Sequence, residues 1–142
     1  MVLFLEQTDW MKFPWTEDIV NYVREITEPV DTILLGRKLA EGFIPHWANV
    51  VKDTNNPEYE GGVKFTTTPK VVFSKTLNTS IWDNTIVANG DLVAEVTKLK
   101  NQEGKDLIAY GGGTFVSSLI KNKLIDELYL FINPTSIGNG MP

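Results

Sequence analysis

The stretch Leu107-Ile108-Ala109-Tyr110-Gly111-Gly112-Gly113-Thr114 decides the fold. Its first half is a short apolar run of the kind found in buried strands. Thr114 follows the glycines and opens a segment with Phe115, Val116, Leu119 and Ile120 at helical spacing. We expect Thr114 to be the N-cap of that helix. The stretch therefore predicts a strand, a tight glycine turn and a helix.

Four further apolar runs flank this stretch, and each predicts a strand. They are Asp31–Gly36, Lys70–Ser74, Thr85–Ala88 and Leu128–Ile132. They are apolar at nearly every position, with little alternation between apolar and polar residues. This pattern is typical of strands buried on both faces, as in parallel sheets.

Helical periodicity fills the intervals between several of these runs. Thr16 can cap a helix that runs to about Thr27, beyond which Pro29 prevents continuation. Asp91 can cap another helix, with Gly104 beyond its end. Alternating strands and helices predict right-handed βαβ units. The expected fold is α/β and three-layered, with a mostly parallel central sheet and helices on both faces.

The stretch from about Pro45 to Pro69 lacks clear periodicity and contains Asn55-Asn56-Pro57 and Gly61-Gly62. We expect a long loop here. Such loops are usually functional or mobile, but a tolerated surface insertion is an equal alternative.

Composition excludes several classes of protein. The chain has 142 residues, which fits one domain over residues 1–142. Its formal charge of -5 disfavours nucleic-acid binding. Zero cysteines and one histidine argue against disulfides and a transition-metal site. No apolar run approaches the roughly 20 residues that span a bilayer, so we expect a cytoplasmic protein without membrane contact.

The glycine turn is the strongest candidate binding site. Consecutive glycines let a ligand approach the backbone, because no Cβ intervenes. The helix that follows offers free N–H groups and the positive end of its dipole to a phosphate. A tight turn that merely needs positive φ is the structural alternative, for which one glycine would suffice.

Two further strand ends carry suitable groups. Gly36-Arg37-Lys38 places two cations after one strand, and the Arg fork suits a phosphate. A solvated basic pair is the alternative. Ser74-Lys75-Thr76 follows the next strand and offers hydroxyls and a cation without a carboxylate. This set favours the 2′-phosphate of NADP over the free ribose hydroxyls of NAD.

The sequence does not identify a catalytic residue. His46 is the single histidine, and a structural or surface role suits it better than catalysis. Trp10, Trp15 and Trp47 are candidates to line a pocket for a flat heterocycle, although aromatic residues more often belong to the core.

An ordered series of stretches resembles a known family. The chain is similar to dihydrofolate reductase-like proteins, and especially to the RibD C-terminal domain group of riboflavin-biosynthesis reductases. The resemblance covers most of the chain from about Asp9 onward, and it is carried by Asp31–Lys38, Val71–Leu77, Leu99–Gly113, Leu124–Leu128 and Asn133–Gly140.

This resemblance implies an enzyme that binds NADPH and transfers hydride to a pteridine-like or pyrimidine-like heterocycle, of the dihydrofolate or riboflavin-precursor type. The implied cofactor-binding residues are Gly36, Arg37, Lys38, Ser74, Lys75, Gly111, Gly112, Gly113 and Thr114. The family also implies a homodimer, and an unusual backbone at Gly111-Gly112 that includes a cis peptide in some members.

The chain departs from the family pattern at both ends. Only Val2–Leu5 resembles the opening strand, and the chain stops at Met141-Pro142, before the final strands. We therefore expect parts of the terminal strands to be missing. Asp9 and Glu17 are the nearest carboxylates to the substrate side, but neither is a convincing proton donor. A nucleotide-binding module without turnover is the alternative, and a flavodoxin-like FMN domain is a third hypothesis.

Overall fold

The computed structural model describes residues 16–130. No helix among them is long and apolar enough to cross a membrane. In chain order the elements are α1 (Glu17–Thr27), β1 (Val30–Gly36), α2 (Arg37–Val50), α3 (Tyr59–Thr67), β2 (Lys70–Phe73), β3 (Thr85–Ala88), α4 (Leu92–Lys100), β4 (Asp106–Tyr110) and α5 (Gly113–Lys121).

The four strands form one parallel sheet in the order β3-β2-β1-β4. The register aligns the carboxyl ends of the strands. Gly36 pairs with Phe73, Phe73 pairs with Ala88, and Leu35 pairs with Tyr110. The segments that follow all four strands therefore emerge at one edge of the sheet.

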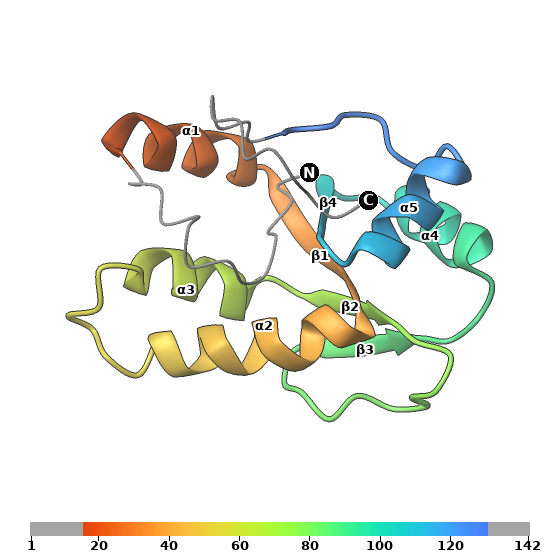
Figure 1. The fold of residues 1–142 in the computed structure, drawn as a ribbon, viewed down its shortest axis with the longest axis horizontal. Helices are drawn as coiled ribbons and strands as arrows, with labels where there is room; N and C mark the ends of the chain where they lie inside the picture. Colours follow the sequence, from red (N-terminus) through yellow and green to blue (C-terminus); the bar gives the residue numbers. More distant parts are fainter. Residues whose placement is uncertain (1–15, 131–142) are drawn as a thin grey trace, which may run out of the picture.

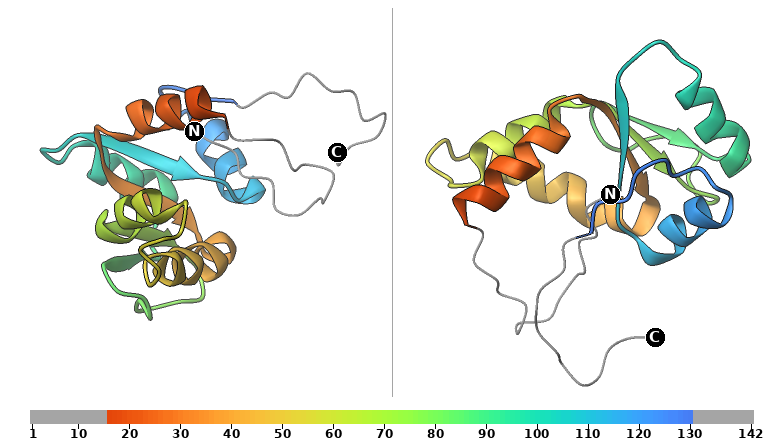
Figure 2. Two further views of the ribbon diagram at one scale, coloured as in Figure 1. Left: turned by 90° about the vertical axis from the view of Figure 1, so that its left-hand side faces the viewer. Right: turned by 90° about the horizontal axis from the view of Figure 1, so that it is seen from above.

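Helices cover both faces of this sheet, which confirms the three-layer α/β fold. Ile33, Leu35 and Val72 belong to a buried cluster with residues of α2 and α3 packed against it. Leu34 and Val71 point to the opposite face, where residues of α4 and α5 pack. The view from above in Figure 2 places α2 and α3 on one side of the strands and α4 and α5 on the other (see also Figure 1). Alternate residues of β1 thus reach different cores.

Four of the five predicted strands are confirmed, with bounds within one residue of those expected. The fifth differs. Leu128–Leu130 has no strand structure, and Leu128 and Leu130 are exposed. The remaining part of that predicted strand, residues 131–132, lies outside the described residues. The apolar run alone was not sufficient, because a strand also requires a hydrogen-bonded neighbour.

The predicted long loop over 45–69 is wrong. α2 continues through Pro45 to Val50, and α3 occupies Tyr59–Thr67, so that only residues 51–58 connect the two helices. Ala40, Ile44 and Val50 are buried on one face of α2. Pro45 is exposed. Burial of that face therefore outweighs the loss of one helical hydrogen bond at the proline.

Helix caps follow the sequence in part. The Asp91 carboxylate accepts a hydrogen bond from the Ala94 N–H at 3.0 Å, which confirms the cap of α4. Thr16 precedes α1 as expected, but its side chain makes no capping bond to the backbone. Thr114 is not a cap, because α5 begins at Gly113 and Gly112 holds the N-cap position.

Two lysines donate hydrogen bonds to backbone carbonyls at the ends of α1 and α3 and at the start of β1. Lys64 Nζ donates to the carbonyls of Glu28 and Val30 at 3.2 and 3.0 Å. Lys70 is only 3% exposed, and its Nζ donates to the carbonyls of Thr66 and Thr68 at 3.2 and 2.7 Å. Burial lowers the pKa of the Lys70 ammonium.

Candidate functional site

Three segments that the sequence singles out meet at the carboxyl edge of the sheet. Gly36–Lys38 spans the end of β1 and the start of α2, Ser74-Lys75 follows β2, and Gly111–Thr114 follows β4. The strand order puts β1 between β2 and β4, so the three segments are neighbours in space. We refer to these three segments together as the carboxyl-edge site.

The connections change direction at this site. After β1 the chain passes to α2 on one face, and after β4 it passes to α5 on the other, although β1 and β4 are adjacent strands. In open parallel sheets, ligands bind outside the carboxyl ends of the strands at such a switch point. The topology therefore predicts a ligand site between Arg37 and the glycine turn.

The reason for glycine differs among the three positions of the turn. Gly111 and Gly112 have φ values of 30° and 85°, which favour glycine. Gly113 does not have positive φ, and apart from its chain neighbours and the backbone of its own helix no described heavy atom lies within 4 Å of the position that a Cβ would take there. The expected unusual backbone is present as positive φ, while the Gly111–Gly112 peptide is trans. Backbone geometry thus explains two glycines and leaves Gly113 to another cause.

Gly36 also has a packing role. A Cβ on Gly36 would lie 3.0 Å from the Cβ of Phe115, in the first turn of α5. Phe115 in turn stacks on Phe73, with ring centroids 5.1 Å apart. Gly36 therefore lets α5 approach the end of β1 closely, which brings the glycine turn beside Arg37.

The three cations of the site differ in their hydrogen-bond partners and exposure. The Arg37 Nη1 donates to the Glu41 carboxylate, four residues further along α2. Lys75 Nζ donates to the Gly90 carbonyl at 2.7 Å, which ties together the loops that follow β2 and β3. Lys38 is exposed. Arg37 and Lys75 each have a partner within the chain, so a bound anion would share or replace those contacts.

Ser74 organises its own loop. Its hydroxyl is buried and accepts hydrogen bonds from the N–H groups of Thr76 and Leu77 at 3.1 and 3.0 Å. Such a turn fixes the backbone after β2. The structure thus places Ser74 at the site as a residue that shapes the loop around Lys75.

Sequence reasoning missed two residues at this site, Glu41 and Phe115. A signal was available for Glu41, because residues four apart on a helix face one another and Arg37 begins α2. Phe115 was assigned only to the apolar stripe of its helix. Its contact with Gly36 depends on the distance between β1 and α5, which the sequence does not report.

The other candidates lie elsewhere or outside the described residues. His46 is exposed on α2, with its ring 4.9 Å from that of Trp47. Trp47 packs on Phe65 in an aromatic group over the sheet, at a centroid distance of 4.5 Å. Glu17 is exposed at the start of α1. Trp10, Trp15 and Asp9 lie outside the described residues.

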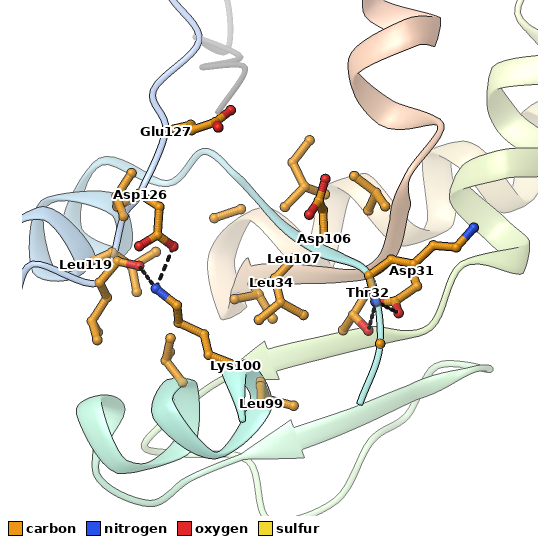
Figure 3. A pocket seen from close by; sticks show the side chains of 18 of the residues that line it. Asp31, Thr32, Leu34, Leu99, Lys100, Asp106, Leu107, Leu119, Asp126 and Glu127 are labelled. Carbon is orange, nitrogen blue, oxygen red and sulfur yellow. Dashed lines mark hydrogen bonds and ion pairs between the residues drawn. The ribbon is translucent and has the colours of Figure 1, made fainter. Parts of the chain in front are cut away.

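A cavity of about 360 Å³ lies away from the carboxyl-edge site, against the sheet and residues of α4 and α5 (Figure 3). Leu34, Leu107 and Leu119 contribute apolar walls. Charged residues surround them: Lys100 pairs with Asp126, and the Asp31 carboxylate accepts the Lys105 N–H at 2.7 Å. None of the residues predicted for cofactor binding lines this cavity.

Comparison with known proteins identifies the family of this chain. The family model for the RibD C-terminal domain matches residues 6–142. The chain belongs to the RibD C-terminal domain family. The predicted resemblance is thereby confirmed over nearly the whole chain, and the fold is reductase-like.

One relative is similar over nearly the whole length of this chain. The chain is 35% identical over 138 residues to YyaP of Bacillus subtilis (strain 168), described as an uncharacterized protein. The alignment covers 96% of this chain and 69% of YyaP.

Proposed function

We propose that this RibD C-terminal domain is an NADPH-dependent reductase that transfers hydride to a pteridine-like or pyrimidine-like heterocycle, of the riboflavin-precursor or dihydrofolate type. The observation that carries the proposal is the adjacency of Arg37 and the glycine turn at the point where the connections change direction. A forked cation beside an exposed helix N-terminus suits a ligand with several phosphates.

The residues present fit such a dinucleotide. Gly113 leaves open space at the first turn of α5, where a side chain would stand between a ligand and the backbone. α5 has no acidic residue in its first turn, so nothing there opposes an anion at its N-terminus. The cations Arg37, Lys38 and Lys75 lie on the neighbouring segments.

Each segment then has a role toward NADPH. Arg37 would hold the 2′-phosphate through its planar fork, with Lys38 and Lys75 adding positive charge. Ser74 keeps the loop that carries Lys75 in shape. The backbone N–H groups of Gly111–Thr114 would hold the pyrophosphate at the start of α5. NADPH supplies the hydride, and the protein orients the ring and excludes water.

The test is a pair of measurements on the purified protein. Binding is followed by the fluorescence of NADPH on titration, with NADH as the comparison. Turnover is followed by the loss of nicotinamide absorbance with dihydrofolate and with deaminated pyrimidine precursors of flavin. We expect tight NADPH binding, weaker NADH binding and oxidation with one substrate class. Failure to bind either nucleotide would refute the proposal.

A nucleotide-binding module without turnover is the second candidate. Among residues 16–130, the side chains at the carboxyl-edge site are cations and hydroxyls, and the nearby carboxylate of Glu41 is paired with Arg37. That set binds anions but includes no free acid to protonate a substrate. NADPH binding without oxidation of any heterocycle would favour this candidate.

By analogy with its family, we also propose that the protein forms a homodimer. Light scattering over a range of concentrations tests this, and a monomer at every concentration would contradict it.

A further inference from the structure

The Arg37–Glu41 pair has consequences for ligand choice. Arg37 is the first residue of α2, and its Nη1 donates to Glu41 Oε1. The two side chains are 35% and 49% exposed. The contact uses one of the five N–H donors of the guanidinium, so the pair holds Arg37 without filling its fork.

The Arg37–Glu41 ion pair contributes little to stability. A cation at a helix N-terminus opposes the dipole, and the first turn of α2 has no acidic residue to offset it. Glu41 supplies that offset from one turn further on. However, Arg placed N-terminal to Glu at this spacing is the less favourable order, and exposed ion pairs contribute little to stability. An arriving anion can therefore displace Glu41 from Arg37.

We propose that Glu41 competes with the 2′-phosphate of the nucleotide for Arg37 and so limits the preference of the site for NADPH over NADH. The inference rests on the proposed function. A dianionic phosphate at Arg37 comes close to the Glu41 carboxylate, which repels it, and also takes over the donor that Glu41 had used. NADH has no 2′-phosphate, so Glu41 has little effect on its binding.

The test is Glu41→Gln, which keeps the size of the side chain and removes its charge. Expected is NADPH binding that is tighter by about three-fold to ten-fold, with NADH binding unchanged. The matched control is Glu25→Gln, which removes the same charge from an exposed position on α1. It should leave both affinities unchanged. The gain in Glu41→Gln should shrink as salt increases, because the charges are exposed.

A double-mutant cycle with Arg37→Ala separates competition from repulsion through space. Competition requires a smaller gain from Glu41→Gln when Arg37 is absent. An equal gain in both backgrounds would overturn the inference, as would equal tightening of NADH, no change, or weaker NADPH binding. If the wild type and Glu41→Gln both fail to bind NADPH, the proposed function and the inference about Glu41 are both wrong. NADPH binding without the expected gain overturns the role of Glu41 alone.

Discussion

Gly36 and Phe115 are in direct contact across the junction of β1 and α5: a Cβ added to Gly36 would lie 3.0 Å from the Phe115 Cβ. The distance is shorter than about nine in ten real contacts of a Cβ atom, and the opposing atom is itself fixed close to the backbone of α5. The contact holds two segments of the carboxyl-edge site, Arg37 and the glycine turn, side by side.

Gly36→Ala should therefore destabilise the protein by about 1–3 kcal/mol, the usual cost of overpacking. Urea unfolding measures the change. The control is Gly61→Ala in α3, where the nearest atom to a new Cβ lies 4.0 Å away on the Phe65 ring. That substitution should stabilise by about 0.5–1 kcal/mol, because alanine favours helix. Equal stability changes in the two variants would contradict the packing role of Gly36.

Gly113→Ala separates a ligand-facing glycine from a structural one. The position is the first residue of α5 and has open space around it, so folding stability should be unchanged or rise by up to about 1 kcal/mol. NADPH binding should weaken about ten-fold, since a methyl group then stands in the path of the phosphates. Unchanged affinity would mean that no ligand approaches Gly113.

Gly112, the neighbour of Gly113, should differ from it in its effect on folding stability. Gly112→Ala should lower stability by about 1–2 kcal/mol, because φ of 85° is unfavourable for an L-residue. Thermal and urea unfolding of the two variants distinguish them without any ligand. Similar stability in both would argue against the turn geometry described above.

Arg37→Ala should weaken NADPH binding about ten-fold to a hundred-fold, given about 1.5–3 kcal/mol for a hydrogen bond to a charged group. NADH binding should change little. Titrations of wild type and variant with both nucleotides measure this. Equal losses would place Arg37 at the pyrophosphate or in the fold, and no loss would make it a solvated cation.

Asp91→Ala should cost about 1 kcal/mol of stability, because the Ala94 N–H loses its acceptor at the start of α4. Asp91→Asn is the control and should retain most of that stability, since asparagine caps equally well. Chemical unfolding of both variants provides the comparison. A loss of the same size in Asp91→Asn would point to charge in place of capping.

Lys70 should make stability depend on alkaline pH. Burial lowers its pKa in the folded state from the ordinary 10.5, so the unfolded chain keeps this proton to higher pH. Between the two pKa values the unfolded state binds more protons, and folding stability rises with pH. The free energy of unfolding of wild type, relative to Lys70→Met, should therefore increase as pH approaches 10.5. A flat or falling difference would contradict this.

The strands of the sheet were predictable because each is an apolar run in sequence. Lys70–Phe73 is buried over its first three residues, as two-sided burial predicts. Thr85–Ala88 is an edge strand on which Ile86 is exposed, so its apolar run predicted the strand but not its burial. The three segments of the carboxyl-edge site were also predictable, since each follows such a run. Their order in space was not, because β4 reaches its place beside β1 only through a crossover.

Several predictions were wrong because they rested on local sequence preferences alone. Pro45 and the Gly61-Gly62 pair predicted a loop, but the buried faces of α2 and α3 outweighed these local preferences. Thr114 is a suitable cap by residue type, yet Gly112 takes that position because positive φ is required there. The Leu128 run has strand composition without strand structure over the described residues.

Pro45 has one further consequence for the site. Residue 45 would normally donate its N–H to the carbonyl of Glu41, and proline has no N–H to give. The backbone turn that carries Arg37 and Glu41 is thus less firmly joined to the rest of α2. The amide protons of residues 41–44, which do have helical acceptors, should exchange with solvent sooner than those of residues 46–50, because the first turns can open without unwinding the helix behind them.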